Sequence, residues 1–191
     1  ANNRAQKFDS DGNWKQNYTN ASYASGIAVS DNGDVYVGLR AGTVKKYTND
    51  GTYKLQWNAG NAPYGITVHN NIVYIINMWI SNSKIKRYDT NGSALASLTP
   101  RYNNMNSSIV VNDNGIYLSH TYDHFISQHS LQGNFIKKVG SSGSGPGQFR
   151  YVWDIAPDSN GNIFATDWHN HRVNKFTKAL VYVSDLNGSS N

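Results

Sequence analysis

Residues 143–176, GSGPGQFRYVWDIAPDSNGNIFATDWHNHRVNKF, decide the fold of this chain. A glycine-rich loop leads into a short apolar strand around residues 153–156, and a Pro-Asp-Ser-Asn-Gly-Asn turn follows it. A second strand at 163–166, a polar corner and a third strand at 172–176 complete the stretch. Short apolar runs between turn-forming residues, without a helical period, predict an antiparallel meander.

The same stretch resembles the NHL repeat, whose pattern opens with G-x-G-x-G-x-F and closes with N-H-R-V-Q-K-F. The matching positions are Gly143, Gly145, Gly147, Phe149 and residues 160–164 and 170–176. The resemblance implies a β-propeller, which has six blades in NHL proteins and often acts as an interaction scaffold. Some NHL domains bind single-stranded RNA on a basic, aromatic face.

Self-similarity extends along the whole chain. A polar turn after an aromatic residue, or after a histidine in the fourth copy, precedes glycines 12, 51, 92 and 133, which are 39, 41 and 41 residues apart. A period near 40 with four short strands is typical of a propeller blade. We therefore predict an all-β fold, a single β-propeller domain of four-stranded antiparallel blades. The expected parts are an outer half-blade at 1–20 and blades at 21–58, 59–99, 100–139 and 140–191.

The strand count is uneven, because residues 4–8 and 13–16 open the chain as outer strands without inner partners. About four and a half repeats do not make the six blades that the resemblance implies. Three explanations are open. The chain is part of a longer protein, it closes as a ring of four or five blades, or its open blade edges pair between chains in a homo-oligomer.

Composition restricts the environment. Charged residues make up 15% of the chain, tyrosine is abundant, and cysteine is absent, so there is neither a disulfide nor thiolate chemistry. No apolar run is long enough to predict membrane insertion. A chain rich in Asn, Ser, Thr and Tyr favours an extracellular or cell-surface location. N-glycosylation motifs begin at Asn17, Asn20, Asn91, Asn106 and Asn187.

The candidate site follows from strand order. In an antiparallel blade, the connection entering the first strand and the one between the second and third strands lie on the same face. Aromatic, arginine and histidine residues gather in these connections, and such residues are the usual anchors of binding patches. We predict that they stack on and hydrogen-bond to a protein, peptide or glycan. The predicted ligand-binding residues are Arg40, Tyr64, Trp79, Tyr122, Trp153, Trp168 and His169.

Catalytic and metal sites are less well supported. A metal site needs three or four converging ligands, and we expect the two weak clusters, residues 167–171 and 120–124, to be structural. The loop at 140–147 lacks the Lys-Ser/Thr and helix of a phosphate cradle. A similar six-bladed lyase that cleaves peptidyl-hydroxyglycine holds zinc with histidines, and this sequence does not reproduce that set. We predict no catalytic residue and no cofactor.

The predicted function is therefore a non-enzymatic binding or scaffold module. The net charge of +5 is spread over strand positions, which favours a solvated basic rim over a nucleic-acid footprint. Two alternatives stay open. One is a metal-dependent lyase or hydrolase, and the other is a module that binds single-stranded RNA by stacking bases on its aromatic residues.

Overall fold

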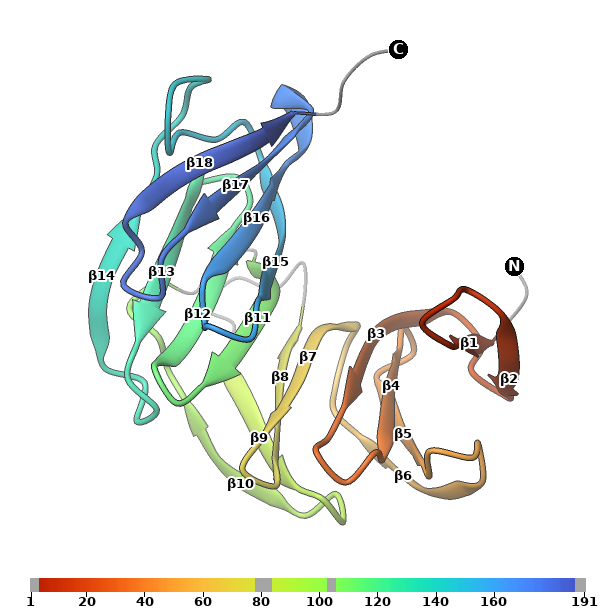
Figure 1. The fold of residues 1–191 in the computed structure, drawn as a ribbon. Helices are drawn as coiled ribbons and strands as arrows, with labels where there is room; N and C mark the ends of the chain where they lie inside the picture. Colours follow the sequence, from red (N-terminus) through yellow and green to blue (C-terminus); the bar gives the residue numbers. More distant parts are fainter. Residues whose placement is uncertain (1–3, 78–83, 103–105, 188–191) are drawn as a thin grey trace. The chain divides into compact units, whose positions relative to one another are not determined.

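The computed structural model describes residues 4–77, 84–102 and 106–187. In these residues all regular structure is β-strand except for one short 3-10 turn, η1 (Trp168–Asn170). The strands form four four-stranded sheets and one two-stranded sheet (Figure 1). In each four-stranded sheet consecutive strands are neighbours, as in a meander. The prediction of an all-β fold with four-stranded antiparallel blades is confirmed.

The strands follow one another in chain order. The two-stranded sheet consists of β1 (Ala5–Phe8) and β2 (Trp14–Tyr18). The next sheets are β3 (Ala24–Val29), β4 (Val35–Leu39), β5 (Thr43–Tyr47) and β6 (Tyr53–Asn58), then β7 (Pro63–His69), β8 (Ile72–Asn77), β9 (Ile85–Asp89) and β10 (Ala94–Leu98). The last sheets are β11 (Asn106–Asn112), β12 (Gly115–His120), β13 (Phe125–His129) and β14 (Phe135–Val139), then β15 (Val152–Pro157), β16 (Ile163–Asp167), β17 (Arg172–Phe176) and β18 (Tyr182–Asn187).

Two compact units make up the chain. Unit 1 comprises Ala1–Met78 and Lys86–Ser97, and unit 2 comprises Trp79–Ile85 and Leu98–Asn191. The sheets that contain β1 to β10 lie almost wholly in unit 1. The sheets β11–β14 and β15–β18 lie in unit 2.

The recurring glycines close a tight hairpin turn. At Gly12, φ is +82°, and its N–H donates to the Asp9 carbonyl at 3.1 Å. The Asp9 carboxylate accepts hydrogen bonds from the backbone N–H groups of Asp11 and Asn13 at 3.1 and 2.8 Å. Asn13 thus belongs to the turn. The second strand therefore runs from Trp14 to Tyr18, so it starts one residue later and ends two residues later than expected.

The last copy of this turn has no glycine. Leu180 takes the left-handed position with φ +52°, and its N–H donates to the Thr177 carbonyl at 2.8 Å. Its side chain is buried in the core of unit 2. Apolar packing therefore offsets the strain of a branched residue in the left-handed region.

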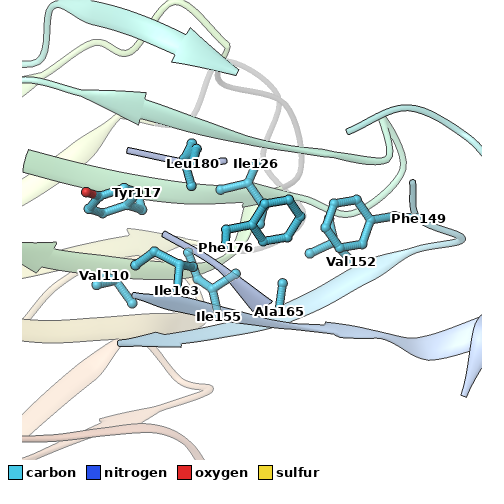
Figure 2. Close-up of a cluster of buried hydrophobic side chains, with 10 residues drawn as sticks. All are labelled: Val110, Tyr117, Ile126, Phe149, Val152, Ile155, Ile163, Ala165, Phe176 and Leu180. Carbon is cyan, nitrogen blue, oxygen red and sulfur yellow. The ribbon is translucent and has the colours of Figure 1, made fainter. Parts of the chain in front are cut away.

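The core of unit 2 lies between its two sheets. In Figure 2 the rings of Phe149 and Phe176 lie close to each other, with centroids 5.8 Å apart. Tyr117 reaches into the same cluster, and its hydroxyl donates to the Lys178 carbonyl at 2.6 Å. Unit 1 has two equivalent clusters, which include Tyr36 and Tyr47. Aromatic residues that recur with the repeat thus pack neighbouring sheets together.

Each four-stranded sheet has a β-bulge near the start of its first strand. In β15, Val152 pairs with Asp167 and Ile155 pairs with Ala165, so two residues oppose Thr166. The same register break occurs in β3, β7 and β11. The unpaired residue that directly follows the last pair before the break is equivalent in all four sheets, and we call it the bulge position. The bulge positions are Ser25, Tyr64, Ser107 and Trp153.

The turn geometry predicts the cost of two glycine substitutions. At Gly12 an added Cβ meets no heavy atom within 4 Å, so Gly12→Ala should cost about 1 kcal/mol of unfolding free energy through positive φ alone. At Gly42, with φ +95°, an added Cβ would lie 2.8 Å from the Gly60 carbonyl oxygen. Gly42→Ala should therefore cost clearly more. Urea unfolding of both variants checks this, and equal losses would contradict it.

Candidate functional site

Five rings of unit 2 form a connected surface, which we call the aromatic cluster: Tyr122, Tyr151, Trp153, Trp168 and His169. The indoles of Trp153 and Trp168 meet edge to face, with centroids 5.5 Å apart and planes 61° apart. His169 lies 4.7 Å from Trp168 and 4.8 Å from Tyr151, and Tyr122 lies 5.6 Å from Tyr151, centroid to centroid. Such contacts hold rings in defined orientations and contribute about 0.5–1.5 kcal/mol each.

Both sheets of unit 2 contribute to the aromatic cluster. Tyr122 comes from the connection between β12 and β13, and Tyr151 immediately precedes β15. Trp153 is in β15, while Trp168 and His169 are in η1. The side chains of Trp153 and Trp168 remain 39% and 58% exposed. Two large apolar rings are therefore available to a ligand.

A buried ion pair holds the corner beneath the aromatic cluster. The Asp167 carboxylate is fully buried and lies 3.0 Å from the Arg172 Nε. The same carboxylate accepts hydrogen bonds from the Arg150 backbone N–H at 2.7 Å and from the Asn170 amide at 2.8 Å. A buried charge with this many donors is well compensated.

The same arginine fastens the glycine-rich loop. One terminal nitrogen of Arg172 donates to the carbonyls of Gly145 and Gln148, both at 2.8 Å. The matched motif positions of the NHL resemblance therefore meet at one arginine. The arrangement explains why a glycine-rich stretch, a corner and a strand start occur together in this sequence.

Backbone hydrogen bonds connect the residues of the aromatic cluster to this corner. The N–H of Trp168 donates to the Tyr151 carbonyl at 3.1 Å, and the N–H of His169 donates to the Arg150 carbonyl at 3.0 Å. The Tyr151 N–H donates to Nδ1 of His124 at 3.1 Å. Tyr151 itself has φ +69°, a conformation that needs support from its surroundings. The backbone segments that carry the rings are thus fixed.

A hollow of about 210 Å³ opens between the indoles, and its described lining residues are Trp153, Thr166 and Trp168. The Thr166 hydroxyl accepts a hydrogen bond from the Asp154 N–H at 2.9 Å and donates to the Asp154 carbonyl at 3.3 Å. Because the backbone already uses this hydroxyl, the walls are apolar in character. The hollow suits a group with an apolar body.

The structure describes six of the seven predicted site residues, and they fall in two places. Tyr122, Trp153, Trp168 and His169 are brought together in the aromatic cluster of unit 2. Their role in ligand binding stays a prediction.

The other three predicted residues fall elsewhere. Arg40 and Tyr64 meet in unit 1, where Cζ of Arg40 lies 5.7 Å from the centroid of the Tyr64 ring. Trp79 lies outside the described residues. The role of these three in binding also stays a prediction.

Tyr151 and His124 belong to the site but are absent from the predicted set. Tyr151 is equivalent to Tyr23 of unit 1, which also precedes a first strand and has φ +54°. The Tyr23 carbonyl accepts the N–H of Arg40 at 3.0 Å, just as the Tyr151 carbonyl accepts that of Trp168. The repeat of tyrosine before the first strand is the signal that could have identified Tyr151. Nothing in the sequence points to the bond from its N–H to His124.

In the two histidine-containing clusters, residues 167–171 and 120–124, side chains of the cluster bond to neighbouring protein groups. Asp167 is committed to Arg172, and His171 is exposed in a left-handed conformation with φ +54°. Within residues 4–77, 84–102 and 106–187, no group of three or more His, Cys, Asp or Glu is placed to hold a metal ion. In the same ranges no helix has the length and apolar character needed to cross a membrane.

In the second cluster, His120 does not lie in a loop, because it is the buried last residue of β12. Its Nε2 is 2.7 Å from the Ser127 hydroxyl, which is 2.9 Å from Nε2 of His129. Its ring stacks on Phe125 with centroids 4.3 Å apart. Burial, with help from the nearby charges of His129 and Lys138, lowers the pKa of His120 to about 3. Burial also lowers the pKa of His129.

Comparison with known proteins agrees with the sequence motif. A family profile described as the NHL repeat matches residues 149–176. The human protein NHL repeat-containing protein 3 is 27% identical over 178 residues, which cover 80% of this chain and 51% of that protein. The chain thus spans about half the length of this curated relative. Both findings confirm the resemblance to NHL repeats.

Solved structures share the fold at low sequence identity. A streptogramin B lyase has a TM-score of 0.75 at 14% identity, over 99% of this chain and 63% of that chain. Virginiamycin B lyase from Staphylococcus aureus has a TM-score of 0.72 at 18% identity, over 99% and 64%. A chain of a nidogen/laminin complex has a TM-score of 0.74 at 14% identity, over 96% and 71%. These likenesses confirm the β-propeller fold.

Removing Arg172 should lower the unfolding free energy, because it leaves the buried Asp167 without its partner. Arg172→Ala leaves a buried carboxylate without its cation, and we expect a loss of about 3–5 kcal/mol in unfolding free energy. Lys15→Ala, which breaks the more exposed pair with Asp9 at 2.8 Å, serves as control and should cost much less. Urea unfolding measures both, and similar losses for the two variants would show that the corner does not depend on this pair.

Stability should fall on mild acidification. Because the pKa of His120 is lowered to about 3 in the folded protein, the unfolded chain binds a proton first as the pH drops below about 6.5. The unfolding free energy should decrease from there toward pH 3, by at most about 1.4 kcal/mol per pH unit for this group. His120→Phe should flatten the curve, whereas exposed His169→Gln should not. An unchanged slope in His120→Phe would contradict this.

Proposed function

We propose that this NHL-repeat β-propeller is a non-enzymatic binding module, which presents the aromatic cluster of unit 2 to a protein, peptide or glycan partner outside the cytoplasm. One observation carries the proposal. Two exposed indoles are held edge to face over a hollow, on a corner that a buried ion pair fixes. Large exposed aromatic rings on a rigid scaffold are typical of binding hot spots.

Preorganisation makes the aromatic cluster suitable for binding. Backbone hydrogen bonds to Tyr151 and Arg150 hold the main chain of Trp168 and His169. Their rings also contact neighbouring rings, so few side-chain rotamers are lost when a partner arrives. Tryptophan buries a large area for two rotatable side-chain bonds. A partner would therefore gain apolar contact at low entropic cost.

The relatives support binding without deciding the partner. The nidogen/laminin complex shows that a chain with this fold takes part in an assembly of proteins. Virginiamycin B lyase is an enzyme with the same fold, so fold alone does not assign activity. A metal-dependent lyase or hydrolase would bring a stoichiometric metal ion, which metal analysis of the purified protein detects.

Exposed N-glycosylation motifs support an extracellular location. Asn20, Asn91 and Asn187, each the first residue of an N-glycosylation motif, are exposed. An extracellular protein would meet proteins and glycans of the cell surface or matrix. Such partners define the panel for the experiment below.

The proposed site is tested by matched tryptophan substitutions. Extracellular proteins and glycans are immobilised, and binding of the wild type, Trp168→Ala and Trp14→Ala is compared by surface plasmon resonance. Trp14 is 55% exposed in β2 of unit 1 and has a similar surface area to lose. We expect Trp168→Ala to weaken partner binding at least tenfold, about 1.4 kcal/mol, and Trp14→Ala to leave it unchanged. Equal binding by all three proteins would refute the proposed site.

A further inference from the structure

The two units contain equivalent positions, and unit 1 shows how one of them is used. Tyr64 occupies the bulge position of β7. Arg40 follows β4 in the preceding sheet, and its Cζ lies 5.7 Å from the centroid of the Tyr64 ring. A guanidinium from the neighbouring sheet thus covers the ring. This is a cation–π contact made within the chain.

Unit 2 has the ring but lacks the cation. Trp153 occupies the equivalent bulge position in β15. The residue of the preceding sheet that corresponds to Arg40 is Thr121, which follows β12. Thr121 is buried, and its hydroxyl donates to the Ser107 hydroxyl at 2.7 Å. The position equivalent to Arg40 therefore offers Trp153 no positive charge.

Several described lysines and arginines lie over other rings. In the described part of the chain they lie over tyrosine and phenylalanine, for example Lys138 over Phe125 at 4.5 Å and Lys175 over Phe164 at 5.1 Å. None of these cations lies over Trp153 or Trp168. Tryptophan is nevertheless the ring that attracts a cation most strongly. Both indoles are exposed to receive one from outside.

A carboxylate is next to Trp153 in the bulge of β15. The bulge of β15 places Trp153 and Asp154 together opposite Thr166, and both side chains are exposed. One Asp154 oxygen accepts the Ile155 N–H at 2.9 Å, so the carboxylate is oriented by the backbone. The Asp154 backbone N–H donates to the hydroxyl of Thr166, which lines the apolar hollow. The surface there suits a ligand with an apolar stem and a positive end.

We infer that the hollow between Trp153 and Trp168 binds an arginine side chain of a protein partner, as Tyr64 receives Arg40 within the chain. Arginine fits better than lysine because its planar guanidinium stacks on indole and pairs with a carboxylate. A sugar would need free hydrogen-bonding groups in the hollow, and the Thr166 hydroxyl is already committed. An anion would meet the charge of Asp154. The inference rests on the proposed function and names the chemistry of the partner.

The first experiment uses small probes with the full chain. Nα-acetyl-arginine amide is titrated into ¹⁵N-labelled protein while the indole N–H signals are followed by NMR. Nα-acetyl-citrulline amide is the neutral control of the same shape, and Nα-acetyl-leucine amide is the apolar control. We expect the arginine probe to shift the Trp153 and Trp168 signals saturably, with at least fivefold higher affinity than either control. Equal affinity of arginine and citrulline probes, stronger leucine binding, or no shift would overturn the inference.

Substitutions locate the charge that recognises the probe. Asp154→Asn keeps the oxygen that accepts the Ile155 N–H and removes only the charge, so it should weaken the arginine probe at least threefold and leave the leucine probe unchanged. Asp31→Asn, an exposed aspartate of unit 1, is the matched control and should have no effect. Trp153→Ala should abolish the saturable shift of the Trp168 signal, and Trp14→Ala should not. An Asp154→Asn protein that binds the arginine probe like wild type would overturn the assignment of the carboxylate.

The outcomes separate the inference from the proposed function. If a partner from the surface plasmon resonance panel needs Trp168 but the arginine probe does not bind, the binding surface stands and the arginine chemistry is wrong. If the arginine probe binds but no partner depends on Trp168, the chemistry is right and the proposed function fails.

Discussion

The buried pair of Asp167 and Arg172 is the interaction on which the organisation of unit 2 depends. Asp167 ends β16, and Arg172 begins β17, so the pair closes the corner that contains η1. Arg172 also fastens the glycine-rich loop that enters β15. Strand pairing, loop position and ring orientation are thus coupled through one charged contact. Removing a partner of such a pair is costlier than never having built it.

Repetition of backbone geometry with changing side chains links the fold to the site. The bulge recurs in every four-stranded sheet, but its first residue is serine in β3 and β11. There the hydroxyls of Ser25 and Ser107 donate to carbonyls of the following sheet, those of Pro63 and Trp153. In β15 the same position is Trp153, which is exposed. One backbone position therefore serves packing in two sheets and carries an exposed indole in another.

The sequence was a good guide wherever a local rule operates. Glycine at a fixed period after polar residues predicted the hairpin turns, because only glycine adopts positive φ without strain, as at Gly12. Four of the seven predicted site residues meet because antiparallel order alone places their connections on one face. Leu180 shows the limit of the rule, since core packing keeps a branched residue in the glycine position. The hydrogen bond from Tyr151 to His124 joins residues 27 apart, and no local pattern encodes it.

The fastening of the glycine-rich loop has a consequence for how the protein meets proteases. Glycine-rich surface loops are preferred cleavage sites, because a protease must draw a segment into an extended shape in its active site. Here the Phe149 side chain is buried, its N–H donates to the Ser141 carbonyl at 2.9 Å, and Arg172 holds two further carbonyls of the loop. Extending this segment would break those bonds and pull an aromatic ring from the core. A stretch whose composition resembles a flexible linker is thereby a protected part of the folded protein.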